Sequence, residues 1–224
     1  MSQRFSSRLI KKEKVAKNTY SFYFEKGHFK FLPGQYLRMT LDIKNPDERG
    51  SSRFFTISSS PLEKYLVITT RIIRSTFKKR LFALEEGEEV TLFGPLGKFI
   101  LEEKDLSPKV FISAGMGITP FHSMISYANK KKLKIPISLI ASFSNGLEMI
   151  FGSELTQISK ENKFIKVNFT IRKLTAEILR KQIDNKAFDF LIVGPPGMVE
   201  QIKEILVSIG VENQNIGTED FTGY

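Results

Sequence analysis

Ile112-Ser113-Ala114-Gly115-Met116-Gly117-Ile118-Thr119-Pro120 is the stretch that decides the fold, because it joins an apolar run to a helical pattern. Two glycines between a strand and a helix let the backbone approach a pyrophosphate, whose charge the free amides and the positive helix end stabilise. Thr119 adds a hydroxyl, and Pro120 suits the first turn of a helix. The stretch predicts a phosphate-binding turn. An ordinary tight turn is the alternative, because the third glycine of the dinucleotide fingerprint is missing.

Downstream, continuous apolar runs alternate with helical patterns. The apolar runs are residues 110–114, 135–143 and 188–193, and the helical patterns are 120–130, 175–183 and 196–209. Buried strands that alternate with helices predict a doubly wound parallel sheet. In such a sheet the loops at the carboxyl ends of the strands line the ligand crevice. Gly194, Pro195, Pro196 and Met198 form one of these loops, for which a plain strand-to-helix connection is the alternative.

Upstream, the period changes to two, which is typical of short half-buried strands. Three runs show it: Tyr20, Phe22, Phe24; Leu37, Met39, Leu41; and Leu66, Ile68, Thr70. Turn signals separate them, which indicates a small antiparallel barrel or sandwich, and we expect the barrel. One helix interrupts it, capped by Ser75 or Thr76 and burying Phe77, Leu81 and Leu84. We expect two domains, residues 1–105 (the barrel half) and 106–224 (the α/β half), with a turn over residues 94–99 ending the barrel.

The segment Arg53-Phe54-Phe55-Thr56-Ile57-Ser58-Ser59 is the chemically richest part of the barrel half. An arginine, an aromatic ring and a hydroxyl close together suit a flavin, which needs a counter-charge for phosphate, a stacking surface and a hydrogen bond to its ring edge. Packing of Phe54 and Phe55 in the core is the competing interpretation.

The composition limits the redox chemistry and the partners that the chain can have. The 224 residues include 34 Lys plus Arg against 24 Asp plus Glu, a net charge of +10, and no Cys. Without cysteine there is no disulfide, thiolate nucleophile or iron–sulfur cluster, so electron transfer would need an organic cofactor. We expect no metal site. The barrel half carries +7 and the α/β half +3. This charge is typical of a chain that binds nucleic acid, an anionic membrane surface or an acidic protein, although a basic chain with no such partner is equally compatible with it.

Taken together, in this order, these segments resemble the ferredoxin-NADP reductase superfamily of FAD-dependent oxidoreductases. The resemblance spans essentially the whole chain and implies a flavin-binding barrel followed by an NAD(P)-binding α/β domain, as a module with no fused iron–sulfur partner. It implies FAD rather than FMN as cofactor, and NADH or NADPH as hydride donor.

The resemblance also implies roles for individual residues. Arg53 would pair with the flavin phosphates, Phe55 would replace the usual tyrosine that stacks on the flavin, and Thr56 would bond near its reactive nitrogen. The residues implied to bind cofactor or coenzyme are Arg53, Phe54, Phe55, Thr56, Ile57, Ser58, Arg71, Ser75, Thr76, Gly115, Gly117, Ile118, Thr119, Pro120, Gly194, Pro195, Pro196, Met198, Phe221 and Tyr224. Val193 stands where the superfamily commonly has a cysteine, and we expect activity to survive this difference.

The C-terminal residues resemble the acidic-x-aromatic ending of the superfamily. There an aromatic ring covers the flavin and a glutamate lies near the reacting carbons. The resemblance therefore implies Thr56, Glu219 and Phe221 as catalytic residues, with Tyr224 as an alternative cover. A disordered tail is the competing interpretation.

The expected function is hydride transfer from NAD(P)H to flavin, followed by electron delivery to a separate acidic carrier such as ferredoxin or flavodoxin. A flavin, ferric or quinone reductase, or the reductase component of an oxygenase, is an alternative. A non-catalytic nucleotide-binding module is an alternative of another class. Ser144 and Asn145 stand where NADPH users often carry a basic residue, which favours NADH, but Arg172 or Lys173 leaves NADPH open. We expect no nucleic-acid partner, no transmembrane segment and a cytoplasmic location.

Overall fold

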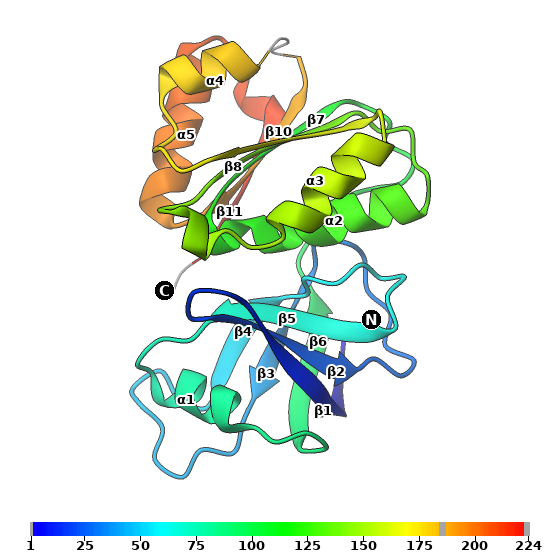
Figure 1. Ribbon diagram of the computed structural model, residues 1–224, viewed down its shortest axis with the longest axis vertical. Helices are drawn as coiled ribbons and strands as arrows, with labels where there is room; N and C mark the ends of the chain where they lie inside the picture. Colours follow the sequence, from blue (N-terminus) through cyan, green and yellow to red (C-terminus); the bar gives the residue numbers. More distant parts are fainter. Residues whose placement is uncertain (1, 184–186, 222–224) are drawn as a thin grey trace.

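The computed structural model describes residues 2–183 and 187–221 and has two halves, one above the other in Figure 1. The barrel half is a six-stranded antiparallel sheet in the order β4-β3-β6-β1-β2-β5. Its strands are β1 (Gln3–Ala16), β2 (Thr19–Glu25), β3 (Tyr36–Thr40), β4 (Ser52–Thr56), β5 (Tyr65–Arg71) and β6 (Glu89–Leu96). The two edge strands approach each other just after β4, where Ser58 N–H donates to Val67 O of β5 at 2.9 Å. The sheet therefore curls into a barrel.

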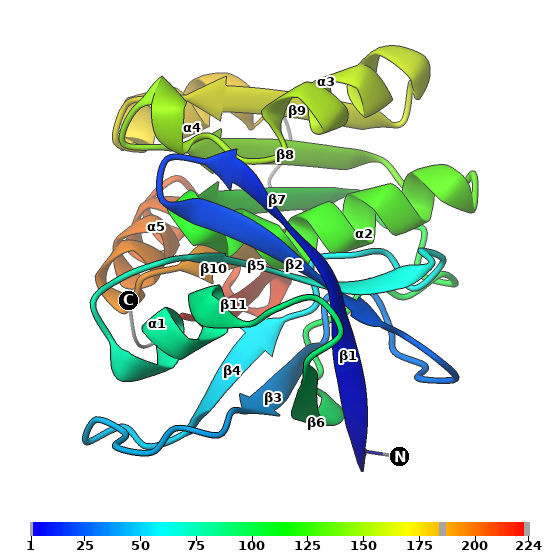
Figure 2. The ribbon, with the colours of Figure 1, turned by 60° about the horizontal axis from the view of Figure 1, so that its bottom comes forward.

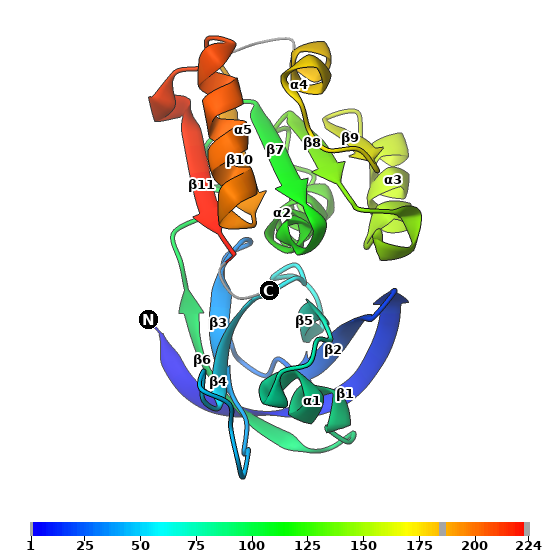
Figure 3. The same ribbon diagram turned by 90° about the vertical axis from the view of Figure 1, so that its left-hand side faces the viewer.

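The inside of this barrel is filled as the period of two predicts. Phe22, Phe24, Leu66 and Ile68 have no exposed surface. Helix α1 (Thr76–Ala83) lies inside the curve of the sheet (Figures 2 and 3), and Ser75 caps it by accepting a hydrogen bond from Lys78 N. The predicted apolar face of α1 is confirmed, because Phe77, Leu81 and Leu84 are all fully buried.

The α/β half is a five-stranded parallel sheet in the order β11-β10-β7-β8-β9, as Figure 3 shows. Its strands are β7 (Lys109–Ala114), β8 (Ile137–Ser142), β9 (Ile165–Thr170), β10 (Asp189–Gly194) and β11 (Ile216–Asp220). Helices α2 (Ile118–Lys130) and α3 (Gly152–Glu161) cover one face, and α4 (Ala176–Gln182) and α5 (Pro196–Ser208) the other. Short 3₁₀ turns are η1 (Gly115–Gly117), η2 (Gly146–Glu148) and η3 (Asn213–Asn215).

The alternation along β7 explains how one strand supports both helical layers. Phe111 faces α2, where its ring stacks on Phe121 with centroids 4.5 Å apart. Val110 and Ile112 point to the other face and pack with residues of α4 and α5. The doubly wound sheet predicted from the sequence is confirmed.

The sequence patterns did not single out β9 or α3, and three further elements differ from the sequence-based expectation. Strand β1 was not predicted, because its residues are mostly polar or charged; it forms by pairing with β2 along one part of its length and with β6 along the other. The turn expected over residues 94–99 begins only at Gly97, whose φ is +94°, because Gly94–Leu96 still pair as part of β6. Strand β11 was not expected as a strand, and it places the acidic C-terminal segment in the sheet.

The two halves are joined through the start of α2. His122 Nδ1–H donates to Ser58 O at 2.7 Å, and Ser123 Oγ–H donates to Ser59 O at 2.6 Å. A domain boundary near residues 106–108, between β6 and β7, stays a prediction. In the part of the chain that the structure describes, no helix has both the length and the apolar character to cross a lipid bilayer.

Candidate functional site

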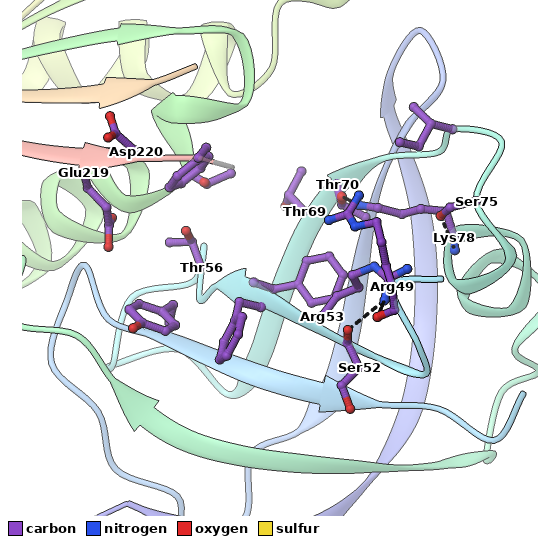
Figure 4. A pocket seen from close by; sticks show the side chains of 16 residues that line it. Arg49, Ser52, Arg53, Thr56, Thr69, Thr70, Ser75, Lys78, Glu219 and Asp220 are labelled. Carbon is purple, nitrogen blue, oxygen red and sulfur yellow. Dashed lines mark hydrogen bonds between the residues drawn. The ribbon is translucent and has the colours of Figure 1, made fainter. Parts of the chain in front are cut away.

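A cavity of about 520 Å³ lies between the two halves, and both contribute to its walls (Figure 4). Most of the lining comes from the barrel half, from β3, β4, β5, α1 and the loops that precede β4 and follow β5, and the rest comes from α2 and the end of β11. The lining residues are Tyr36, Arg49, Ser52, Arg53, Phe54, Phe55, Thr56, Thr69, Thr70, Ile73, Ser75, Lys78, Thr119, Glu219, Asp220 and Phe221. The cavity therefore brings together parts of the segments that the sequence singled out around Arg53, Ser75 and Glu219, with Thr119 from the start of α2.

One end of the cavity is cationic. Arg53 is 9% exposed and its Nη1 donates to the carbonyls of Arg49, Gly50 and Ser52 at 2.7–2.8 Å. Its Nη2 donates to Asp47 Oδ1 at 2.8 Å. Arg53 thus fixes the loop before β4, and this loop presents Arg49 to the cavity (Figure 4).

Asp47 is the carboxylate that supports this loop. Thr76 donates to Asp47 Oδ2 from both its backbone amide and its hydroxyl. These bonds from Thr76, together with the one from Arg53, hold the pKa of Asp47 below its usual value. Asp47 therefore links the start of α1 to the Arg53 loop.

The middle of the cavity is aromatic. Phe55 is 8% exposed and packs on Phe77 with ring centroids 5.8 Å apart. Phe54, on the other face of β4, is 63% exposed and meets Tyr36 edge to face at 5.8 Å. Thr56 is buried beside them and lines the cavity. Phe55 thus belongs to the core and also reaches the cavity wall, and its stacking on a flavin stays a prediction.

The opposite end of the cavity is acidic (Figure 4). Glu219 lies in β11, and burial raises its pKa to about 7. Its Oε2 is buried without a hydrogen-bond partner. Phe221 N–H donates to Gly194 O at 2.9 Å, which ties the residues after β11 to the end of β10. Glu219 and Phe221 are thus held by the sheet, while Tyr224 lies outside the described residues.

The two glycine-containing loops of the α/β half lie against each other. A Cβ on Gly117 would stand 2.2 Å from Val193 O, so only glycine permits this approach of η1 to the end of β10. Gly115 has a φ of +52° and open space around its Cα. Thr119 lines the cavity, and its hydroxyl donates to Met116 O at 2.9 Å. The loops at the ends of β7 and β10 therefore form one surface.

Several residues implied by the resemblance lie outside the cavity lining. Ile57 is in the barrel core, and the Ser58 hydroxyl bonds Thr69 Oγ1 at 2.9 Å. Arg71 points to η2, where its Nη2 donates to Glu148 Oε2 at 2.7 Å. The remaining ones are Thr76, Gly115, Gly117, Ile118, Pro120, Gly194, Pro195, Pro196 and Met198.

The structure adds lining residues that the sequence did not reveal. Of these, Lys78 had a usable signal: it stands three residues before Leu81, which places it at the edge of the apolar face of α1. The run Lys78-Lys79-Arg80 hid this signal, since consecutive basic residues are typical of a solvated face. Arg49 and Tyr36 had no local signal, because only tertiary pairing brings them to β4.

Comparison with known proteins gives consistent findings. The family model described as oxidoreductase NAD-binding domain matches residues 111–204. Flavohemoprotein A of Dictyostelium discoideum is 28% identical over 94% of this chain, and the match spans 58% of that protein. The chain thus corresponds to only part of this relative.

Solved structures agree on the fold. The flavohem-like FAD/NAD-binding domain of nitric oxide dioxygenase from Vibrio cholerae superposes with a TM-score of 0.81 at 20% identity, covering 96% of this chain and 98% of that one. Ferredoxin-NADP⁺ reductase from Plasmodium falciparum gives a TM-score of 0.82 at 18% identity, covering 97% and 96%. The arrangement of barrel half and α/β half is therefore that of these proteins.

Proposed function

We propose, from the premise that the chain belongs to the ferredoxin-NADP reductase-like superfamily, that it is a flavoprotein reductase that oxidises NADH or NADPH. The observation that carries the proposal is the cavity between the halves, which joins a cationic end, an aromatic wall and a buried carboxylate. Two similar proteins support the same assignment. They are Flavohemoprotein A and the FAD/NAD-binding domain of nitric oxide dioxygenase, both of which this chain resembles.

The lining fits a flavin nucleotide. Positive charge gathers at one end, where Arg49 and Arg53 suit phosphate. Phe55 offers a ring to stack on, and Thr56 offers a hydroxyl beside it. The unpaired Oε2 of Glu219 lies at the far end, where a polar ring edge would satisfy it. We therefore assign FAD to this cavity.

Bound FAD would supply the hydride acceptor and release the electrons to a second acceptor. The protein's own part is binding and orientation. The paired loops at Gly117 and Gly194 would hold the NAD(P)H pyrophosphate with backbone amides at the start of α2. Phe221, fixed to Gly194, would place the nicotinamide relative to the cavity.

Glu219 would hold a proton near the site of hydride transfer. Its pKa of about 7 means that near neutral pH it is divided between the acid and the carboxylate. A carboxylic acid here donates a hydrogen bond that a carboxylate does not. Glu219 therefore makes the site sensitive to pH in the physiological range.

The test uses purified full-length protein. We expect it to retain FAD and its flavin absorbance to bleach anaerobically on addition of NADH or NADPH. A protein that binds neither FAD nor FMN would overturn the proposal, and one that binds FAD but is not reduced would be a nucleotide-binding module.

For the acceptor we propose an acidic electron carrier such as ferredoxin or flavodoxin, docking on the barrel half, which holds +7 of the net charge of +10. Free flavin, ferric chelates and quinones are the competing acceptors. A comparison of kcat/KM among these acceptors decides between them. The cytoplasmic location stays a prediction.

A further inference from the structure

Lys78 occupies an unusual place for a lysine. It lies in the first turn of α1 and is 8% exposed, yet it lines the cavity (Figure 4). Its Nζ–H donates to Thr70 Oγ1 and lies 4.8 Å from the centre of the Phe55 ring. A neutral hydroxyl and an aromatic face leave most of the charge of a buried ammonium uncompensated.

The groups around Lys78 add to its positive surroundings. Arg49 and Arg53 repel it from the loop before β4. Asp47 is the nearby carboxylate, and its two oxygens already accept from Arg53 and from Thr76. Within the described ranges, no ion pair joins Lys78 to an acidic side chain.

This arrangement affects the protonation of Lys78. Burial, followed by repulsion from Arg49 and Arg53, lowers its pKa to about 7. At pH 8 the amine is therefore mostly neutral in the empty site. An anion placed among Lys78, Arg49 and Arg53 would favour the ammonium form of Lys78, and this ammonium would then bind the anion.

We propose that Lys78 binds a phosphate group of the flavin nucleotide, and that phosphate binding is coupled to uptake of a proton from solvent by the Lys78 amine. The inference rests on the proposed function, since it needs a flavin nucleotide in the cavity. Ser75, which lines the same end, provides a neutral hydroxyl to the same group.

Lys78 thus has a role distinct from that of Arg53. The guanidinium of Arg53 is permanently charged and is held by four acceptors of its own loop. The amine of Lys78 gains its charge when the phosphate arrives. The affinity for FAD should therefore fall about tenfold for each pH unit above the pKa of Lys78, toward the limit set by the neutral amine.

The experiment is calorimetric titration of FAD into the full chain freed of bound nucleotide, in buffers of different ionisation enthalpy. We expect uptake of close to one proton per FAD at pH 8, and close to none at pH 6, where Lys78 is already charged. Riboflavin, which has no phosphate, serves as the reference ligand. Riboflavin reaches the Glu219 end of the cavity but places no phosphate at the Lys78 end. Any proton that Glu219 takes up therefore appears with riboflavin as well, and the riboflavin value is subtracted from the FAD value.

Variants separate Lys78 from its neighbours. Lys78→Met should abolish the extra proton uptake and weaken FAD more than riboflavin. Lys78→Arg should keep FAD affinity at pH 8 without proton uptake, because a guanidinium stays charged. Lys79→Met is the matched control, since Lys79 is the next residue and is exposed, and it should behave as the unmodified protein.

The comparison of FAD with riboflavin needs no variant, so it decides the matter even if Lys78→Met does not fold. FAD binding with the same proton uptake as riboflavin at pH 8 would overturn the inference and leave the flavin site in place. Failure of FAD, FMN and riboflavin alike to bind would instead overturn the proposed function on which the inference rests.

Discussion

At the scale of single residues, Glu219 shows how burial turns an ordinary carboxylate into a pH-sensitive group. Its pKa rises from 4.5 to about 7, so the folded state prefers the neutral acid. The free energy of unfolding therefore falls as pH rises from below 4.5 through 7, because ionisation of Glu219 destabilises the folded protein.

We expect Glu219→Gln to remove this dependence. The variant should gain about 2 kcal/mol over the unmodified protein at pH 8.5 and nothing at pH 4.5, as measured by urea unfolding. In the loaded enzyme, the rate of flavin reduction by NADH should lose its pH dependence between 6 and 8. Identical pH profiles for the two proteins would show that Glu219 is ionised throughout.

Arg53 has a structural role that its sequence motif does not disclose. Arg53→Ala leaves three backbone carbonyls without this donor and removes one of the donors to Asp47, so we expect a loss of about 2–4 kcal/mol in the free energy of unfolding even in flavin-free protein.

The measurement is thermal or urea unfolding, and Arg74→Ala is the control because Arg74 is exposed. A role limited to pairing with the flavin phosphates, which the family resemblance implies for Arg53, would instead weaken FAD retention far more than folding. Equal stability of Arg53→Ala and Arg74→Ala would restore that expectation.

At the scale of elements, the contact between η1 and the end of β10 sets the geometry of the coenzyme loops. Gly117→Ala would place a methyl group against Val193 O and push the loops apart. We expect a loss of about 1–3 kcal/mol in stability and a raised KM for NADH, with FAD binding preserved.

Gly197→Ala is the matched control, because a Cβ there meets nothing within 4 Å in the first turn of α5. This variant should keep the original KM. A normal KM in Gly117→Ala as well would mean that the loops do not bind the coenzyme.

Helix α2 is the element that couples the two halves, through His122. The ring lies between two acceptors, Ser58 O and Glu154 Oε2 at 2.9 Å, and stacks on Phe151 at 3.8 Å. Both bonds are made at once when the imidazole carries two protons. The hydrogen bond from His122 lowers the pKa of Glu154.

His122→Phe keeps the stacking and removes both bonds, so we expect a loss of about 1–3 kcal/mol, measured by urea unfolding at pH 6.5. The contribution of the His122–Glu154 hydrogen bond to the free energy of unfolding is present above pH 4.5 and is lost as pH falls below it, because the pKa of Glu154 is lower in the folded than in the unfolded protein. That contribution should stay under about 1 kcal/mol, since the Glu154 side chain is 54% exposed. A variant as stable as the original would show that the bonds do not hold α2.

At the scale of the whole molecule, the uneven charge predicts how a carrier would associate. If an acidic carrier docks on the barrel half, kcat/KM for the carrier should fall steeply as ionic strength rises from 20 to 300 mM, since the screening length drops below about 10 Å. A neutral quinone is the control acceptor and should show little change. Parallel salt profiles for carrier and quinone would exclude electrostatic steering.

Much of the molecule could be predicted from the sequence because its periodicities are local. The strands with alternating apolar residues, the capped α1 and the parallel sheet follow from side-chain spacing alone. Strand β1 could not be predicted, since pairing with β2 and β6 forms it despite its polar and charged sequence. The same holds for the site: Arg53 and Thr56 stood in a recognisable segment, whereas Arg49 and Tyr36 reach the cavity only through tertiary packing.

Strand β11 has a further consequence, which concerns insertions and deletions. Glu219 pairs with Val193, and its neighbours Thr218 and Asp220 point to the opposite side of the sheet. One residue added or removed within β11 before Glu219 would shift this register and exchange Glu219 for a neighbour. The spacing between the start of β11 and Glu219 therefore constrains the chemistry as strictly as the carboxylate does, although Ile216 and Gly217 do not line the cavity.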